Sequence, residues 1–531
     1  MKRGRLNMKR NRWRRQAAVM LLLFSMVVTA CSGSSGGGGT APTDDAAEKP
    51  AGSETPAASE PAPAKPAEPV KLTMMRSGSG LPAPDKDVIL QALNENLNME
   101  LEITMVPSEY EQQLNVKIAG GSPPDAFQVN KLQMTQYAKQ GLLLDLTPYL
   151  KDMPNVTPEN GFTEDHMKKG QVDGKQYSVP YRPLIPVQTT FWVRQDWLDK
   201  LGLKAPTTLD ELSAVAKAFV EEDPDGNGKK DTIGITGNGF EGTLGPIFAA
   251  FGVAAPGHYM IQNGQVVYST ELPATRQAIE YIKGMIGQGL IDPEFLTNSG
   301  LAHQEKGFKG QAGIVYAHWA HMKRPDMVEK MNSINPNQSW TQLDAMTGPG
   351  GKFADAYDAG NTSYRMVIPK TLEKEPEKVG KLVEYFNYIS GGEGQLLVNF
   401  GLEGRHYNLV DGRPQVIEET LAEVGHATIH QMTGRKELEY LNARFGSLKP
   451  YFEFANALPI ITVYDGFSPI PEGVNPADKA KFESEELVKF IYGTRPTDEF
   501  PAFLQTLRDT FQLELYLTSA SDELMKLGIL K

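Results

Sequence analysis

Apolar and polar residues follow a repeating pattern from residue 70 onward, and its period changes in a regular order. Runs with a period of two are typical of strands, and runs with apolar residues three or four apart are typical of helices. The pattern predicts strand 72–75, helix 87–97, strand 101–106, helix 110–119 and strand 125–129. Strands and helices that alternate over about 60 residues predict parallel βαβ units and therefore an α/β fold.

Helical periodicity dominates the rest of the chain, which has no internal repeat. Thr208 is a favourable cap for the first of these helices, because its hydroxyl can accept a hydrogen bond from a free main-chain amide. Helices are predicted over 208–220, 275–287, 375–390, 477–492 and 499–527. We expect no membrane-crossing segment after the leader.

The first 30 residues have the pattern of a secretory signal peptide. Eight basic residues precede an uncharged apolar stretch, 17–30, which is too short to span a bilayer, for which about 20 residues are needed. The stretch ends in Val28-Thr-Ala-Cys31, which resembles a bacterial lipobox. We predict a signal peptide over 1–30 and acylation of Cys31 with palmitate-type chains, which anchor the protein to the outer face of the cell membrane as in Gram-positive lipoproteins. The alternative is a secreted protein with an unmodified Cys31.

Residues 32–70 are rich in Ser, Gly, Ala, Pro, Thr and Glu and contain almost nothing apolar to bury. We therefore interpret 31–70 as the lipidated Cys followed by a disordered linker. Such a linker suits a tethered binding protein and a tethered enzyme equally well.

Charge and cysteine content narrow the possibilities further. The whole chain has 53 basic and 65 acidic residues, and without the leader the numbers are 45 and 65, a net charge of −20. Such a surface does not attract nucleic acid, so we predict no nucleic-acid partner. Cys31 is the only cysteine, which excludes an intramolecular disulfide and leaves a hydrophobic core to stabilise the fold.

One loop has the spacing of a calcium site. Oxygen-bearing side chains recur at alternate positions, a glycine follows at the sharp turn, and a main-chain carbonyl comes next, as in an EF-hand loop. We predict structural Ca²⁺ held by Asp223, Asp225, Asn227, Lys229 (through its carbonyl) and Asp231. Gly234 stands where an EF-hand has its bidentate Glu. The alternative is a polar turn before a strand.

Tryptophans are the candidate sugar-binding residues, because aromatic faces stack on the C–H faces of sugar rings. Trp319 follows a strand-like run, and Trp192 lies within another. The alternative for each is a place in the core. For Trp197 the helical spacing to Leu201 favours the core.

Catalytic motifs are absent from the sequence. Two histidine pairs, His318/His321 and His426/His430, have spacings used in zinc sites, but neither includes the Glu of His-Glu-x-x-His, so we predict no zinc. There is no Gly-x-Ser-x-Gly, and the acidic residues are too many to single out a glycosidase pair.

Several stretches together resemble the family-one extracellular solute-binding proteins, the lipoprotein receptors of carbohydrate ABC importers. They are 119–127 (Ala-Gly-Gly-Ser-Pro-Pro-Asp-Ala-Phe), 141–146, 173–180, 193–202, 206–212, 289–295, 308–313 and 400–407. The calcium-like loop resembles one in the large oligosaccharide-binding members, with Thr232 where those often have an acidic residue.

This resemblance implies a bilobed, periplasmic-binding-protein-like fold of type II, with two α/β lobes joined by a multi-strand hinge. We expect the chain to cross between lobes near 183–188, 360–364 and 407–412. Lobe one would then be 71–186 plus 361–410, and lobe two 187–360 plus 411–531. Closure about the hinge would trap an oligosaccharide between strand ends.

The resemblance also gives ligand-binding candidates by position. They are Arg76, Ser77, Asn130, Tyr181, Arg182, Trp192, Trp319, Tyr364 and Arg365. The arginines could bond sugar hydroxyls or pair with a uronate carboxylate. The alternative for each is a salt bridge at the surface or between lobes.

The function expected is reversible capture of an oligosaccharide by a monomer and its delivery to ABC permease subunits, without catalysis. Contact with the membrane would be through the lipid anchor only. Two alternatives stay open at this point. One is a membrane-tethered polysaccharide-degrading enzyme, a lyase or glycosidase, and the other is an adhesive cell-wall protein.

Overall fold

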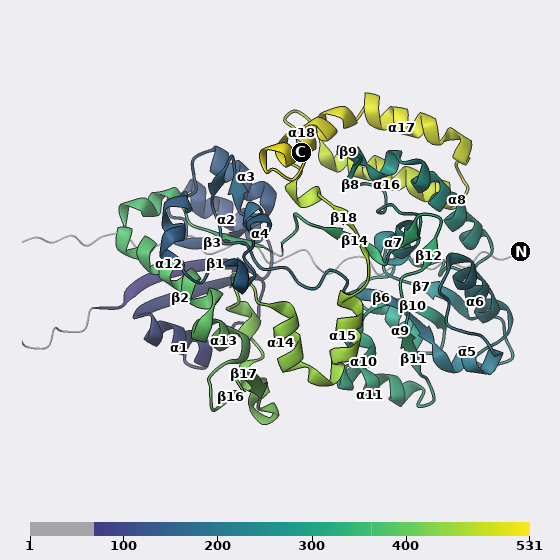
Figure 1. Cartoon of the computed structure of the whole chain (residues 1–531), viewed down its shortest axis with the longest axis horizontal. Helices are drawn as coiled ribbons and strands as arrows, with labels where there is room; N and C mark the ends of the chain where they lie inside the picture. Colours follow the sequence, from purple (N-terminus) through teal and green to yellow (C-terminus); the bar gives the residue numbers. More distant parts are fainter. Residues whose placement is uncertain (1–67, 363) are drawn as a thin grey trace, which may run out of the picture. The chain divides into compact units, whose positions relative to one another are not determined.

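The computed structural model describes residues 68–362 and 364–531, and Figure 1 shows their elements. The predicted signal peptide, Cys31 and residues 32–67 of the predicted linker lie outside the described residues.

A four-stranded sheet with the order β15-β3-β1-β2 includes the first strands of the described chain. Its strands are β1 (Val70–Ser77), β2 (Met99–Val106), β3 (Ala126–Val129) and β15 (Arg365–Val367). β1 is parallel to both β2 and β3, whereas β15 is antiparallel to β3. Buried and exposed residues alternate along β2 as its sequence predicts. The predicted βαβ order is confirmed.

Helices pack on this first sheet, with α1 against β2 and both α2 and α12 against β1. The helices of this part of the chain are α1 (Val88–Asn96), α2 (Tyr110–Ala119), α3 (Lys131–Lys139), α4 (Glu164–Lys168), α12 (Pro376–Ser390) and α13 (Gly392–Phe400).

A second four-stranded sheet has the order β11-β6-β10-β7. Its strands are β6 (Thr189–Arg194), β7 (Ile233–Thr236), β10 (Ala312–His318) and β11 (Trp340–Gln342). β10 is parallel to β7 and antiparallel to β6. The helices that follow these strands along the chain are α5 (Gln195–Leu201), α6 (Leu209–Glu221), α7 (Glu241–Ala250), α8 (Pro273–Gly287), α9 (Ala302–Phe308), α10 (Trp319–Lys323) and α11 (Pro325–Ile334).

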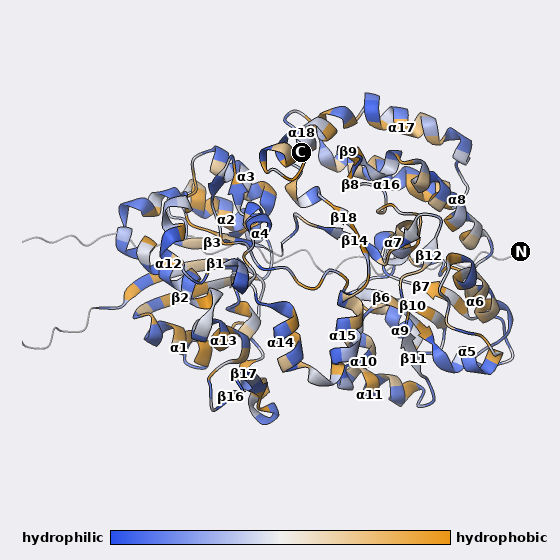
Figure 2. Cartoon of the chain, viewed as in Figure 1, coloured by the Kyte–Doolittle hydropathy of each residue, from blue (hydrophilic) through white to orange (hydrophobic). Residues whose placement is uncertain are grey.

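Helix α6 forms for the reasons that its sequence suggests. The Thr208 hydroxyl accepts from the Glu211 amide, and the Glu211 carboxylate accepts from the Thr208 amide, which completes a capping box. Leu212 and Phe219 lie on its buried face. Figure 2 shows that the other long helices also carry both hydrophobic and hydrophilic residues, as helices with one buried face do.

The C-terminal part is helical, as predicted. It contains α14 (Glu437–Arg444), α15 (Lys449–Asn456), α16 (Pro476–Ile491), α17 (Phe500–Asp509) and α18 (Leu513–Lys526). The helical stretch predicted over 499–527 consists of two helices, α17 and α18, with Gln512 in a left-handed conformation (φ 54°) between them.

Paired short strands complete the structure. They are β4 (Gln171–Val172) with β5 (Lys175–Gln176), β8 (Tyr259–Gln262) with β9 (Gln265–Tyr268), β12 (Thr347–Gly348) with β13 (Gly351–Lys352), β14 (Asp355–Asp358) with β18 (Ile460–Val463), and β16 (Tyr407–Val410) with β17 (Arg413–Val416).

Each large sheet has a hydrophobic core of its own. The first core joins β1 and β2 to α12, and it also includes Val424, Ala427 and Met432. The second core joins β6, β7 and β10 to α16 and α17. None of the helices in the described ranges combines the length and the apolar character needed to cross a membrane.

Candidate ligand-binding site

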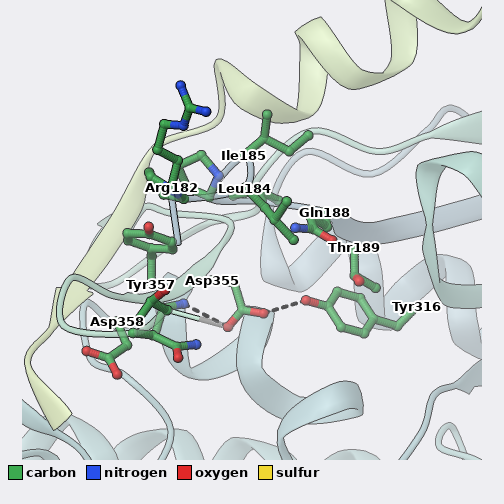
Figure 3. A pocket seen from close by; sticks show the side chains of 15 residues that line it. Arg182, Leu184, Ile185, Gln188, Thr189, Tyr316, Asp355, Tyr357 and Asp358 are labelled. Atoms are coloured by element: carbon green, nitrogen blue, oxygen red, sulfur yellow. Dashed lines mark hydrogen bonds between the residues drawn. The ribbon is translucent and has the colours of Figure 1, made fainter. Parts of the chain in front are cut away.

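A cavity of about 320 Å³ is formed where the chain passes from one sheet to the other. One wall is the segment 182–189, which leads from β5 of the first part to β6 of the second sheet. The opposite wall is β14 with residues 361 and 362, on the way to β15. Tyr316 of β10 also lines it (Figure 3).

A carboxylate and a phenol meet inside this cavity. The Tyr316 hydroxyl donates to the Asp355 carboxylate, and the Ala356 amide donates to the same carboxylate over 2.8 Å (Figure 3). Burial raises the pKa of Asp355 to about 6. Burial, followed by the charge of Asp355, also raises the pKa of Tyr316, so this hydroxyl stays a hydrogen-bond donor at neutral pH.

Asp358 is the second carboxylate of the cavity wall. It accepts from the amides of Gly360 and Gly466, each over 2.9 Å. Burial raises its pKa as well. Tyr357 lies between the two acids in sequence and is only half-buried, so part of its ring is open to the cavity.

Polar, uncharged side chains also line the cavity, together with the apolar residues of the segment 183–187. The Gln188 amide oxygen lies 3.3 Å from the His318 ring, and the Thr362 hydroxyl donates to the Tyr181 carbonyl over 2.8 Å. Acceptors, hydroxyls and an open aromatic ring in one cavity are the groups with which proteins bind carbohydrates. Sequence reasoning did not identify Tyr316, Asp355, Tyr357 or Asp358, although three of them directly precede the predicted crossing at 360–364.

A second cavity, of about 410 Å³, lies at the carboxyl ends of β1 and β3. Ser77 and Asn130, two of the predicted ligand residues, both line it. The Asn130 side chain already accepts from the Gln133 amide over 2.8 Å and so caps α3. The structure thus brings these two residues together, in a cavity apart from the one with Tyr316.

Three other candidates form one stack. The Arg76 guanidinium lies 4.5 Å from the centroid of the Tyr364 ring, and the Tyr181 ring lies 5.0 Å from it on centroids. Arg76 donates to the carbonyl of Ile429, and the Tyr364 hydroxyl donates to that of Gln431 over 3.2 Å. Arg76 and Tyr181 are buried, so little of the stack is open to a ligand.

Arg182 and Arg365 are engaged in the same way. Arg182 donates to four main-chain carbonyls, those of residues 160, 390, 433 and 434, over 2.7 to 3.3 Å. Arg365 donates to the carbonyls of Lys169 (2.8 Å) and Gly360 (3.4 Å). Burial lowers the pKa of Arg182 to about 9 and that of Arg365 to about 10.

Trp192 and Trp319 lie in a hydrophobic cluster beside the second sheet. Trp192 is 0% exposed, and its indole N–H donates to the Ala317 carbonyl over 3.2 Å. Trp319 is 4% exposed and packs edge-on against Phe452, with ring centroids 5.3 Å apart. Protein therefore covers both faces of these rings in this structure.

The predicted calcium loop gathers its oxygens around Asn227. The Asn227 amide group donates to Asp225 (2.8 Å) and to Asp231 (3.0 Å), so it bridges two carboxylates. Asp223 accepts from the amides of Asn227 (3.0 Å) and Gly228 (2.9 Å). Burial and the neighbouring Asp223 and Asp231 raise the pKa of Asp225. An all-oxygen set with repelling carboxylates fits a hard cation.

In the described part of the chain, one group of three side chains brings metal-ligand atoms within 4.8 Å of one another: Asp87, His426 and His430. Asp87 lies 2.9 Å from His426 and 2.8 Å from His430, and it also caps α1 by accepting from the amides of Ile89 and Leu90. Hydrogen bonds already account for this arrangement. Sequence reasoning missed it because Asp87 is far from both histidines along the chain.

Comparison with known proteins relates the chain to a family. The profile of the family described as bacterial extracellular solute-binding protein matches residues 79–387. Lipoprotein LipO of Bacillus subtilis is 29% identical over 338 residues, 62% of this chain and 65% of LipO. The polygalacturonan/rhamnogalacturonan-binding protein YtcQ of the same species is 28% identical over 335 residues, 61% of this chain and 64% of YtcQ. The matches thus cover less than two thirds of either relative.

A solved structure covers more of the chain. The EF-hand mutant of the S. pneumoniae ABC-transporter substrate-binding protein FusA, in complex with fructo-nystose, matches with a TM-score of 0.63. The match covers 87% of this chain and 100% of that one, at 20% identity. The predicted bilobed α/β fold is confirmed.

Proposed function

Because the chain belongs to the bacterial extracellular solute-binding proteins, we propose that it captures an oligosaccharide outside the cell and delivers it to the permease of an ABC importer. The capture is reversible and involves no bond cleavage. The observation that carries this proposal is the cavity lined by Tyr316, Asp355 and Tyr357, which offers an open aromatic ring and hydrogen-bonding groups in one place.

The position of the cavity supports capture by hinge closure. Both of its walls, 182–189 and 355–362, belong to segments that connect the two lobes. A ligand that binds these walls contacts the hinge itself, so its binding energy can favour one lobe arrangement over another.

We propose lobe boundaries that keep the first two predicted crossings and move the third. Val424, Ala427 and Met432 pack in the core of the first sheet. This packing supports a third crossing near residue 435 rather than at 407–412. Lobe one is then 71–186 plus 361 to about 435, by the same packing argument.

Among the predicted ligand residues, we retain Ser77 and Asn130 as candidates for an extended ligand, because they line the second cavity. Arg76, Arg182 and Arg365 are proposed instead to hold the hinge segments, since each donates to main-chain carbonyls. Trp192 and Trp319 are proposed to support the second lobe from its core.

Membrane anchoring through Cys31 is part of the proposal. The lipobox-like sequence before Cys31 supports it, and so does the similarity to a protein named as a lipoprotein. Cys31→Ser, expressed in a Gram-positive host, is expected to move the protein from the membrane fraction to the medium. Equal membrane retention of the variant and the natural protein would contradict the anchor.

Structural calcium at the loop 223–231 is also proposed. The all-oxygen side chains support it, and so does the similarity to FusA, a substrate-binding protein with an EF-hand. Asp223, Asp225 and Asp231 would supply carboxylate ligands, and Lys229 its carbonyl. Bound Ca²⁺ would neutralise carboxylates that otherwise repel one another.

One experiment separates binding from the alternative of a tethered polysaccharide-degrading enzyme. The purified protein is incubated with oligosaccharides while its tryptophan fluorescence and the reaction products are followed. Saturable binding with every saccharide recovered intact supports the proposal. Shortened or unsaturated products would overturn it. The matched relatives are named as binding proteins or lipoproteins, which favours the first result.

A further inference from the structure

The charges around the cavity at residues 182–189 and 355–362 point to the class of ligand, an inference that rests on the proposed function. We propose that this cavity accepts uncharged oligosaccharides and rejects uronic acids. The distinction matters because YtcQ is named for binding acidic polysaccharides, whereas the FusA complex holds a fructo-oligosaccharide.

Among the side chains that line the cavity, the negative charges outnumber the positive charges that a ligand could reach. Asp355 and Asp358 are its acidic residues, and Arg182 is the basic residue among those that line it. The Arg182 guanidinium is already bound by four main-chain carbonyls, and in Figure 3 it extends away from Asp355 and Tyr316. The guanidinium therefore has no free pair of N–H groups with which to bind a carboxylate in the cavity.

Two cations lie behind the wall rather than in the cavity. Lys169 donates from its ammonium group to the Asn361 carbonyl over 3.0 Å, and Arg365 donates to Gly360 over 3.4 Å. Both side chains are buried, 5% and 3% exposed. Their charges partly offset that of Asp358. Their N–H groups, however, donate to the main-chain carbonyls of residues 360 and 361, so these hydrogen bonds are not available to a ligand.

Asp355 has the Tyr316 hydroxyl and the Ala356 amide as its direct partners. The ionisable groups that act on it from farther away are Glu241, of the same sign, and His258, of the opposite sign when protonated. His258 is itself paired with Glu241 (3.4 Å) and Asp465 (3.0 Å). Within residues 68–362 and 364–531, the Asp355 carboxylate thus forms no direct ion pair with a lysine or arginine.

These groups have opposite effects on the two ligand classes. A neutral sugar hydroxyl can donate to an ionised carboxylate in a charge-assisted hydrogen bond, which is among the stronger kinds. A uronate presents a second negative charge to the same wall, where the low dielectric strengthens repulsion. Such a like-charge contact is a common way to exclude a wrong ligand.

The test uses a ligand pair of equal chain length in which methyl esterification removes the negative charge. Fully methyl-esterified and free-acid oligogalacturonides of equal length are titrated calorimetrically into the purified protein at pH 7, beside a panel of neutral fructo-, gluco- and xylo-oligosaccharides. We expect the tightest ligand to be neutral, and every free acid to bind at least tenfold more weakly than its ester or not at all. A free acid that binds as tightly as the best neutral saccharide overturns the inference.

Charge variants locate the effect. Asp355→Asn and Asp358→Asn each keep the side-chain size and one accepting oxygen but remove the charge. Each also gives up one of the two hydrogen bonds that the carboxylate accepts. Each is expected to raise affinity for a uronate relative to a neutral ligand several-fold. Glu329→Gln, which removes one exposed charge on α11 outside the cavity, is the matched control and should leave the ratio unchanged. An unchanged ratio in both Asp variants, with melting temperatures that show folded protein, also overturns the inference.

Failure of the proposed function and failure of this inference alone give different results. If no saccharide of the panel binds, the proposed function fails, and the inference fails with it. If an acidic saccharide binds best, the proposed function stands and only the inference fails.

Discussion

His430 and Asp87 join two distant segments of the chain beside the first sheet, with the imidazole Nε2 2.8 Å from the carboxylate. Both side chains are 0% exposed. His426 approaches the other oxygen of the same carboxylate at 2.9 Å. Because Asp87 also caps α1, one buried carboxylate ties the start of a helix to His430, 343 residues later along the chain.

The segment 426–434 is held at further points along its length. Arg76 binds the carbonyl of Ile429, Tyr364 binds that of Gln431, and Arg182 binds those of residues 433 and 434. Side chains that the sequence suggested as ligand contacts thus fix one strip of main chain. We infer that this strip sets the position at which the chain leaves lobe one.

Removal of the Asp87 carboxylate should therefore destabilise lobe one. We expect Asp87→Asn to lower the free energy of unfolding by about 3 kcal/mol, because it leaves buried histidines without their charged partner and weakens a helix cap. Urea unfolding followed by tryptophan fluorescence measures the change. The exposed Asp85→Asn is the control and should have little effect. Equal midpoints for the two variants would contradict the role of Asp87.

The same carboxylate predicts an acid limit of stability. Burial alone would raise the pKa of Asp87, but the hydrogen bond and charge of His430, with the Leu90 amide, outweigh it and lower the pKa from 3.8 to about 2. A depressed pKa stabilises the folded state above the unfolded pKa, and this contribution is lost as pH falls from about 4 to about 2. The contribution is on the order of 2 kcal/mol.

Urea midpoints measured between pH 5 and pH 2 test this expectation. The natural protein should lose stability more steeply in this range than Asp87→Asn, which has no such group to titrate. Parallel curves for the two proteins would show that Asp87 does not cause the loss.

The proposed calcium loop gives a prediction that depends on the added ion. Ca²⁺ should raise the melting temperature of the natural protein, and Asp223→Ala should abolish most of that increase because it removes one ligand carboxylate. The variant also loses two hydrogen bonds to main-chain amides, so each protein is compared with and without Ca²⁺. Asp210→Ala, exposed on α6, should keep the full increase. A similar increase in Asp223→Ala would refute the site.

The period of the sequence was enough to predict many of the elements but not their long-range contacts. The alternation of β2 and the capping box of α6 are local, and both are confirmed. Asp87 with His430 depends on how distant parts of the chain fold together. No local pattern contains that information, so the sequence showed the histidines as a pair without their carboxylate.

The ligand candidates show a second limit of sequence reasoning. Several candidates were chosen because they lie near a predicted crossing, but which of them face a cavity depends on side-chain direction. Arg182 lines the cavity but binds main-chain carbonyls, whereas Tyr357 at the same cavity keeps its ring half-buried. An aromatic residue in a short strand beside the crossing was the available signal.

Truncation of Trp319 should mainly lower stability, whereas truncation of Tyr357 should mainly weaken ligand binding. Trp319 is 4% exposed and packs on Phe452, so Trp319→Ala is expected to cost about 3 to 5 kcal/mol of stability through the void that it leaves. Tyr357 is half-buried at the cavity, so Tyr357→Ala should weaken oligosaccharide binding by about 1 to 3 kcal/mol and change stability less.

Urea unfolding and calorimetric titration of both variants separate these effects. Trp319→Phe serves as the conservative control, because it keeps an aromatic ring against Phe452 and should recover most of the stability. If the folded Trp319→Phe protein loses sugar affinity while Tyr357→Ala binds normally, the stacking surface lies at Trp319, and the cavity beside Tyr357 is not where the sugar is held.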